Sequence, residues 1–234
     1  TAAIFDQAGI EVLLVGDSAS DNVLGYNGTM PIELSEMIPF GRAVASSAVS
    51  ALVVVDLPFG SYEVSDAQAL TNSIRVIKET GADAVKLEGA KLSQIRALVS
   101  SGIPVMGHVG FTPQSVNTLA GYKVQGRTEQ DAARILQECK DIEAAGAFAV
   151  VLEMIPAELA QEISQQLSIP TIGIGAGAGC DGQILVWQDF AGLGTRSPKF
   201  AKQYLNLRQD LSAAATAFRN EVVAGEFPAP EQQF

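Results

Sequence analysis

The sequence predicts an α/β protein of the (β/α)8 TIM-barrel class, with the first strand of the barrel missing from the given chain. Two observations support this fold class. Short runs rich in Val, Ile and Leu alternate with helical patterns along the chain, and this alternation is typical of parallel α/β proteins. The runs are apolar almost throughout, as expected of strands that are buried on both faces of a sheet.

Seven runs have the length and composition of buried strands. They cover residues 11–18, 51–58, 84–89, 104–109, 148–155, 170–175 and 183–189. The chain has 234 residues, slightly fewer than the roughly 250 of a typical barrel with eight βα units. Because residues 1–5 resemble a helix already under way, we expect the missing strand to precede them. A seven-stranded open sheet of the doubly wound type is the alternative fold.

Capping signals predict the helices between these strands. Ser65 and Gln68, three residues apart, form a capping box, and Gly81 is a typical C-terminal stop. Similar signals predict helices over 128–146 and 156–167. The polar segment that follows the fourth run, residues 112–127, has 16 residues, and loops of this length are often functional lids.

An apolar stripe near the C-terminus predicts a long helix. We expect this helix to form an extension, at about residues 197–225, of a single barrel domain that spans residues 1–234. The stripe consists of Phe200, Tyr204, Leu207, Leu211, Phe218 and Val222.

Composition excludes several classes of protein. The formal net charge of −11 disfavours binding to nucleic acid or to an anionic membrane surface. The longest uncharged apolar-rich run, residues 43–55, has 13 residues, whereas a membrane span needs about 20. Cys139 and Cys180 are the only cysteines, and they form neither a disulfide framework nor a metal knuckle. A reducing, cytoplasmic setting is therefore expected.

Polar side chains close five successive predicted strands. In a βα barrel, the carboxyl ends of the strands carry the functional groups. We expect these side chains to meet at one rim, because a buried charge is costly unless it is paired or bound to a metal. The residues are Asp17 and Ser18 after the first run, Asp56 after the second, Lys86 and Glu88 at the third, His108 at the fourth and Glu153 at the fifth.

Each of these residues also has a purely structural explanation. Asp17 can cap a turn or a helix. Lys86 and Glu88 can form an ion pair that lines the barrel. His108 is the only histidine of the chain, and a lone histidine is more often a core residue than a ligand. We favour a functional interpretation because the structural one requires a separate explanation for each of five strands.

The residue types suggest a particular chemistry. Asp17, Asp56 and Glu88 supply the oxygen ligands that Mg²⁺ prefers, whereas one histidine and two scattered cysteines are a poor basis for a zinc site. This set fits proton abstraction beside a carbonyl group that a metal polarises.

The other charged residues fit an anionic oxo acid as the substrate. Lys86 and His108 can hold the acid and its developing negative charge, and Glu153 can remove the proton. A Schiff base on Lys86, as in metal-free aldol enzymes, is the alternative, although Glu88 and the two aspartates favour the metal.

Several longer motifs resemble the ketopantoate hydroxymethyltransferase family, and the similarity extends over the whole chain. The matching stretches are LLVGDS at 13–18, DLPFGSY at 56–62, VKLEG at 85–89, GHVGFTPQSVN at 107–117, GYKVQGR at 121–127, LEMIPAELA at 152–160, IPTIGIGAG at 169–177 and DGQILVWQD at 181–189. The resemblance implies a (β/α)8 barrel that transfers a hydroxymethyl group, with Mg²⁺, from 5,10-methylenetetrahydrofolate to 3-methyl-2-oxobutanoate. The product would be ketopantoate, an intermediate of pantothenate and coenzyme A biosynthesis, and the family usually forms a homodecamer.

The resemblance also implies roles for individual residues. The aspartates of VGDS and DLPF, Asp17 and Asp56, would ligate the metal. Glu88 would lie beside the metal, directly or through water. The residues implied to contact the oxo acid are Asp17, Ser18, Asp56, Lys86 and His108, and the implied base is Glu153.

Two other functions remain open at this point. An enzyme of the isocitrate lyase and phosphoenolpyruvate mutase type would also use a Mg²⁺-bound oxo acid on a related barrel. The sequence lacks a cysteine near a lid motif of that type, because Cys139 lies in a predicted helix. A barrel that binds oxo acids without turnover is the third possibility, and the intact set of acidic residues disfavours it.

Overall fold

The computed structural model describes residues 1–118, 121 and 123–234. The chain divides into two compact units, residues 1–184 and residues 185–234. We call them the barrel unit and the C-terminal unit. Within the described residues, no helix combines the length and the apolar character that crossing a membrane requires.

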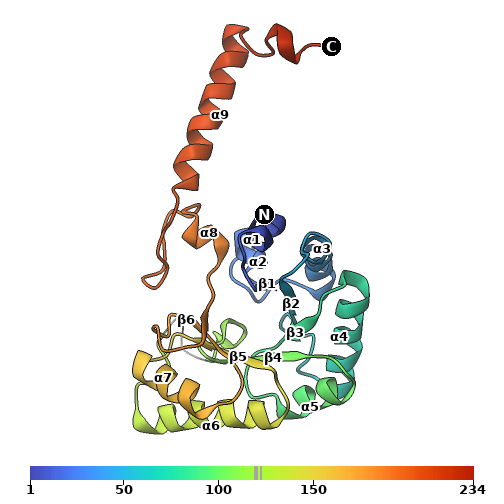
Figure 1. Ribbon diagram of the computed structural model, residues 1–234, viewed down its shortest axis with the longest axis vertical. Helices are drawn as coiled ribbons and strands as arrows, with labels where there is room; N and C mark the ends of the chain where they lie inside the picture. The colour runs from blue at the N-terminus through green and yellow to red at the C-terminus, as the bar shows by residue number, and fades with distance from the viewer. Residues whose placement is uncertain (119–120, 122) are drawn as a thin grey trace. The chain divides into compact units, whose positions relative to one another are not determined.

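One parallel sheet of seven strands forms the centre of the barrel unit, and the strand order follows the sequence from β1 to β7. The sheet curls, and helices α3 to α7 follow one another around its outer side (Figure 1). This arrangement confirms the predicted barrel class and excludes the doubly wound sheet, in which the strand order reverses. The strands are β1 (Val12–Val15), β2 (Leu52–Asp56), β3 (Ala84–Lys86), β4 (Val105–Gly110), β5 (Ala149–Glu153), β6 (Thr171–Ile174) and β7 (Gly182–Gln183).

The two sides of the sheet have separate apolar cores. The larger core lies between the sheet and the helices and includes Val53, Val85 and Val150. The smaller one lies on the inner side of the curled sheet. It consists of Val54, Ala84, Met106, Ala149 and Val151.

Burial differs between the central and the outer strands. Strands β2 to β5 are buried nearly throughout, as the continuous apolar runs predict. Strands β1 and β6 alternate between buried and half-buried residues, because inner-face residues such as Leu14 and Ile172 are only partly covered. Among the described residues β1 pairs only with β2, and β7 only with β6, so the barrel wall is open between its first and last strands.

Most predicted helices are present with the expected caps. The chain opens with α1 (Ala2–Gln7). Helix α4 (Asp66–Thr80) begins after Ser65, whose hydroxyl accepts a hydrogen bond from the Gln68 backbone N–H at 3.1 Å. Gly81 ends α4 in the left-handed conformation, with φ of 78°. The other two predicted helices are α6 (Glu129–Ala144) and α7 (Ala157–Gln166).

Three α-helices in the described part of the barrel unit were not predicted: α2 (Ala19–Asn22), α3 (Leu34–Ala45) and α5 (Leu92–Ser100). Helix α3 contains Pro39 in its interior. Proline lacks the N–H that an interior helical position needs, so the local sequence pattern does not predict this helix. Its start carries a capping box, in which the Glu33 N–H donates to the Glu36 carboxylate at 2.9 Å.

The seventh predicted strand is shorter than expected. The prediction of a strand over residues 183–189 is wrong beyond Gln183, because Trp187–Phe190 forms helix α8. A short apolar run fits a strand and a buried helical turn equally well, and here the backbone changes type within the run.

The C-terminal unit contains α8, α9 (Leu207–Ala224) and the short 3-10 helix η2 (Pro230–Gln232). The predicted long helix starts later than the apolar stripe indicated. Phe200 and Tyr204 precede it, and the Tyr204 ring instead packs edge-on against Phe190 at 6.4 Å between centroids. Asn206 caps α9 through its side chain, which fixes the start one residue later.

The predicted lid segment, residues 112–127, begins with the 3-10 helix η1 (Pro113–Ser115). Leu119, Ala120 and Tyr122 of this segment lie outside the described residues. Its last part is attached to the barrel, because the Gln125 N–H donates to the Met154 carbonyl at 2.9 Å.

Candidate active site at the carboxyl ends of the strands

Strands β1 to β5 bring the predicted charged side chains to one end of the sheet. Asp56 and Lys86 are the last residues of β2 and β3, and they are paired across the two strands. His108 lies within β4, and Glu153 ends β5. Asp17 and Ser18 follow β1 in a tight turn, and Glu88 follows β3 by two residues.

Short polar contacts connect these side chains. The Asp17 N–H donates to Asp56 Oδ2 at 3.1 Å. Asp56 Oδ1 lies 2.5 Å from Lys86 Nζ, which in turn lies 3.3 Å from His108 Nδ1. His108 then reaches two carboxylates: its Nδ1 is 3.5 Å from Glu88 Oε1, and its Nε2 is 3.3 Å from Glu153 Oε2. The residues predicted from five separate strands thus form one continuous cluster.

Ser18 lies beside this cluster, at the start of α2. A Cβ atom on Gly16 would come 3.1 Å from Ser18 Oγ and 3.6 Å from Asp56 Oδ2. The Ser18 hydroxyl and the Asp56 carboxylate therefore both lie next to the space that a side chain at residue 16 would fill. Glycine at this position keeps that space open.

The cluster is buried and carries an excess of acid groups. Asp17, Asp56, Lys86, Glu88 and His108 are each at most 5% exposed, and the Glu153 side chain is 15% exposed. Four carboxylates face one ammonium and one imidazole. Burial of unbalanced charge is costly unless a further partner neutralises it, so the site favours a cation.

The excess of acid groups perturbs the ionisation of the cluster. Burial, together with the neighbouring charges of Asp56 and Glu88, raises the pKa of Asp17 to about 8. For Lys86, burial acts to lower the pKa, but Asp56, Glu88 and Asp17 outweigh it and raise the pKa above its ordinary value. The Lys86 side chain is consequently an ammonium at neutral pH, which disfavours a nucleophilic amine.

His108 is also held in its charged form. Burial and the charge of Lys86 act to lower the pKa of His108, but its contacts with Glu153 and Glu88 outweigh them and raise the pKa to about 9. Although burial opposes ionisation of Glu88, the hydrogen bond and the charge of His108 lower the pKa of that carboxyl. An imidazolium between two carboxylates can stabilise negative charge on a bound anion.

Two buried residues of the site were not predicted from the sequence. Gln114, in η1, and Tyr62, in the loop after β2, are 4% and 1% exposed. The Tyr62 hydroxyl donates to Gln114 Oε1 at 2.5 Å, and Gln114 Nε2 donates to Asp17 Oδ2 at 3.0 Å. Both lie in quoted motifs, DLPFGSY and GHVGFTPQSVN, but their loops gave no periodic signal for where the side chains would point.

The backbone around Glu153 is unusual. Met154, the next residue, has φ of 48°, a conformation that non-glycine residues rarely adopt outside functional sites and turns. Gly110 on β4 has φ of 93°, and a Cβ atom there would come within 2.2 Å of the Glu153 carbonyl oxygen. The end of β5 therefore depends on close backbone approach at Gly110.

The donor set fits a magnesium ion by its chemistry. Asp17 follows β1, Asp56 ends the adjacent strand β2 and Glu88 follows β3, and the Asp17 backbone N–H donates to the Asp56 carboxylate. Among the described residues, no group of three or more His, Cys, Asp or Glu side chains is already arranged as a metal cage. Mg²⁺ does not require one, since it usually takes one or two carboxylates and completes its shell with water and substrate oxygens.

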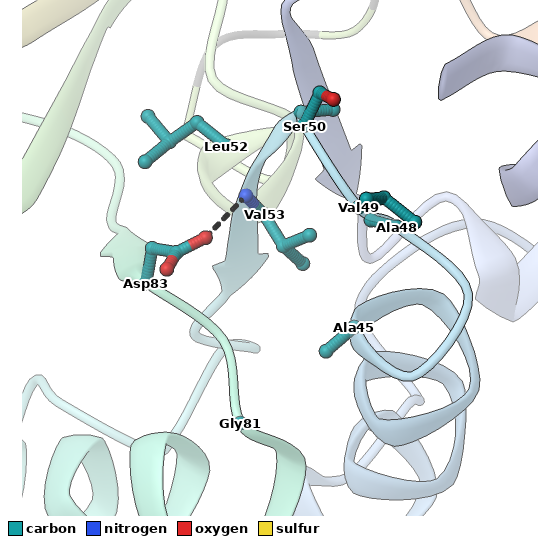
Figure 2. Close-up of a pocket in the computed structure, with 9 residues that line it drawn as sticks. Ala45, Ala48, Val49, Ser50, Leu52, Val53, Gly81 and Asp83 are labelled. Atoms are coloured by element: carbon teal, nitrogen blue, oxygen red, sulfur yellow. Dashed lines mark hydrogen bonds between the residues drawn. The ribbon is translucent and has the colours of Figure 1, made fainter. Parts of the chain in front are cut away.

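A separate cavity of about 330 Å³ lies at the other end of the strands. Figure 2 shows that it opens beside the start of β2, where the Val53 N–H donates to Asp83 Oδ2 at 2.8 Å. None of the predicted site residues lines it. The lining consists of Ala45, Ala48, Val49, Ser50, Ala51, Leu52, Val53, Gly81 and Asp83.

Comparison with known proteins identifies relatives along the whole chain. The family model described as ketopantoate hydroxymethyltransferase matches residues 1–230. A protein of Thermobifida fusca (strain YX), named 3-methyl-2-oxobutanoate hydroxymethyltransferase, is 56% identical over 236 residues, which cover 100% of this chain and 84% of the relative. A protein of Leifsonia xyli subsp. xyli (strain CTCB07) with the same name is 56% identical over 237 residues, with coverage of 100% and 85%.

Solved structures share the fold at low sequence identity. A putative phosphonomutase from Burkholderia cenocepacia J2315 superposes with a TM-score of 0.63 at 13% identity, covering 94% of this chain and 89% of that one. A 2,3-dimethylmalate lyase of the PEP mutase/isocitrate lyase superfamily gives a TM-score of 0.58 at 16% identity, with coverage of 100% and 82%. At these identities the likeness concerns the barrel fold alone.

Proposed function

The chain belongs to the ketopantoate hydroxymethyltransferase family, and from this premise we propose that it transfers a hydroxymethyl group to 3-methyl-2-oxobutanoate, forming ketopantoate. The one-carbon donor in this proposal is 5,10-methylenetetrahydrofolate. The observation that supports it best is the buried cluster of four carboxyl groups, one ammonium and one imidazolium, whose residues all lie in the family motifs. The relatives that share this chain from end to end carry the corresponding enzyme name.

Asp17 and Asp56 would hold Mg²⁺, with Glu88 beside it, directly or through water. When bound, the ion would polarise the keto oxygen of the substrate and so lower the energy of the developing enolate. The oxo acid would lie against Ser18, Asp17 and Asp56. These assignments are consistent with the oxygen-rich, buried character of the cluster.

Lys86 and His108 would bind and orient the anionic substrate. Both carry positive charge at neutral pH, and their charges are held by Asp56, Glu88 and Glu153 at contact distance. A fixed positive group in a site that excludes water stabilises negative charge more strongly than it would in bulk solvent.

Glu153 would act as the base. It is the most exposed carboxylate of the cluster, so its oxygen is the one most accessible to a substrate, and its contact with His108 fixes its direction. In the proposed step Glu153 takes the proton from the branched carbon of the oxo acid. That carbon then bonds to the methylene carbon of the folate, and both carbon–nitrogen bonds of this methylene group break. Water supplies the hydroxyl group, and each of the two folate nitrogens gains one proton, one from the oxo acid by way of Glu153 and one from the water.

The direct test is product formation. Purified protein, incubated with 3-methyl-2-oxobutanoate, 5,10-methylenetetrahydrofolate and Mg²⁺, should form ketopantoate, detected by mass spectrometry, with loss of product when either substrate is omitted. Isocitrate and phosphonopyruvate serve as control substrates, since the fold is shared with enzymes of that superfamily. Turnover of either control without ketopantoate formation would contradict the proposal.

We also propose that the enzyme is cytoplasmic and forms a homo-oligomer, a decamer by family resemblance. Light scattering on the protein eluting from a sizing column tests the assembly. A monomer at micromolar concentration would contradict this part of the proposal without affecting the proposed chemistry.

A further inference from the structure

Gln114 connects three loops of the site, although neither the sequence pattern nor the proposed chemistry gives it a role. We infer that Gln114 is a positioning residue, which holds the Asp17 carboxylate in one orientation and couples it, through Tyr62, to Glu88. This inference rests on the proposed function, because it concerns how the carboxylates that would hold Mg²⁺ are placed.

Four hydrogen bonds connect Gln114 to its surroundings. Its side-chain Nε2 donates to Asp17 Oδ2 and to the Leu57 carbonyl oxygen, each at 3.0 Å. Its side-chain Oε1 accepts from the Tyr62 hydroxyl at 2.5 Å, and its backbone N–H donates to Glu88 Oε2 at 3.0 Å. One residue therefore reaches both acid groups that flank Asp56 in the cluster.

The hydrogen-bonding pattern allows only one orientation of the Gln114 amide. The Glu88 backbone N–H can only donate, and it donates to the Tyr62 oxygen at 3.2 Å. The Tyr62 proton is directed at Gln114 Oε1. The Leu57 carbonyl can only accept, so it requires the NH₂ end of the amide. With Oε1 and one N–H committed in this way, the other N–H is left for Asp17, and rotating the amide by half a turn would break these bonds together.

Burial makes this arrangement consequential. Gln114, Tyr62 and Asp17 are at most 5% exposed, so water is a poor substitute for a lost donor. With its Oδ2 held by Gln114, the Asp17 carboxylate has one oxygen committed and the other left for a further ligand. Replacing a residue that orients a metal ligand in this way typically weakens metal affinity by about 10- to 100-fold.

A merely structural role makes a different prediction. If Gln114 served only to attach η1 to the barrel, its replacement would lower stability and leave the metal affinity of the folded protein unchanged. If it positions Asp17, replacement weakens metal binding in protein that remains folded. Metal affinity and melting temperature, measured on the same samples, therefore separate the two roles.

The experiment uses Mn²⁺ as the probe, because free aqueous Mn²⁺ gives an electron paramagnetic resonance signal that is lost on binding. Gln114→Met keeps the length of the side chain and removes its donors and acceptor. We expect it to weaken Mn²⁺ binding by about 10- to 100-fold. Tyr62→Phe, which removes one hydroxyl, should weaken binding in the same direction and less, and it decides the question if Gln114→Met does not fold.

Gln94→Met is the matched control. Gln94 also contacts Tyr62, donating from Nε2 to its backbone carbonyl at 3.4 Å. Within the described part of the chain, its side-chain hydrogen bonds reach no carboxylate of the cluster. We expect its Mn²⁺ affinity to equal that of the unmodified protein. The double variant Gln114→Met/Tyr62→Phe should bind no more weakly than Gln114→Met, because residues of one network are not additive.

The arms distinguish the possible failures. Asp17→Asn must weaken Mn²⁺ binding; if it does not, the proposed metal site is wrong and this inference fails with it. If Asp17→Asn weakens binding while folded Gln114→Met and Tyr62→Phe bind as the unmodified protein does, the inference alone is overturned. Additive effects of Gln114→Met and Tyr62→Phe would overturn the coupling through Tyr62.

Discussion

The buried pair of Asp56 and Lys86 gives a prediction that separates its structural contribution from its chemical one. Asp56 Oδ1 and Lys86 Nζ are 2.5 Å apart, and their side chains are 3% and 4% exposed. In Asp56→Asn the shape is kept and the negative charge is lost. The Lys86 ammonium then remains buried next to His108, whose Nδ1 is 3.3 Å away and whose imidazole is also charged at neutral pH.

The expected magnitude follows from that environment. Among the described residues, Asp56 is the one carboxylate in ion-pair contact with Lys86, so its loss leaves a buried cation without its direct partner. Breaking a buried pair in this way costs about 3–5 kcal/mol. This is a large part of the free energy of unfolding of a typical domain, which is roughly 5–15 kcal/mol. Removing both charges, in Asp56→Asn/Lys86→Met, should recover much of this loss.

Urea unfolding in the presence of a chelator, at neutral pH, measures these free energies without metal binding. We expect the single variant Asp56→Asn to be less stable than the double variant with Lys86→Met. A single variant within about 1 kcal/mol of the unmodified protein would refute the view that this pair is a tightly balanced buried ion pair, because exposed pairs contribute no more than that.

Three further predictions concern the same rim. Glu153→Gln should slow proton exchange of 3-methyl-2-oxobutanoate in D₂O by about 10²- to 10⁴-fold. Glu158→Gln, at an exposed position on α7, should leave the exchange rate unchanged. If Glu153→Gln exchanges as fast as the unmodified protein, another residue is the base. Gly110→Ala should lower the free energy of unfolding by more than about 1 kcal/mol, measured in urea, because its φ is 93° and its new Cβ would meet the Glu153 carbonyl; a neutral effect would contradict this close approach. The melting temperature of metal-free protein should fall as the pH rises from about 6 to about 9, because the folded state binds more protons than the unfolded chain. The pKa of Asp17 is raised from 3.8 to about 8, and that of His108 from 6.5 to about 9. A melting temperature that rises with pH in the absence of metal would contradict this prediction. Added Mg²⁺ should stabilise the protein more at the upper end of this pH range, because metal binding displaces protons.

The parts of the fold that the sequence predicted are those that depend on local patterns. Continuous apolar runs identify β2 to β5 because both faces of these strands are buried, and Ser65 marks the start of α4 because its hydroxyl completes the first turn. Helix α3 was missed because Pro39 breaks the local pattern, and packing against the barrel, rather than propensity, holds it in place. The end of the seventh run was misassigned because a short apolar segment carries no information on backbone type.

The candidate site follows the same division. The charged side chains were predictable, because a parallel barrel places the ends of successive strands at one rim. Gln114 and Tyr62 were not, because they lie on loops whose path depends on tertiary contacts. Neutral amide and hydroxyl groups are also common in loops, so their presence in a sequence does not distinguish a buried network from a solvated one.

In the proposed function this rim removes a proton from an oxo acid with the help of a divalent cation. Proton NMR of 3-methyl-2-oxobutanoate in D₂O, with the protein and without folate, follows this step alone. We predict that the methine signal disappears when Mg²⁺ is present and persists when Mg²⁺ is removed by a chelator. Persistence of the signal with Mg²⁺ present, in protein shown to bind the oxo acid, would rule out metal-assisted proton removal at this rim.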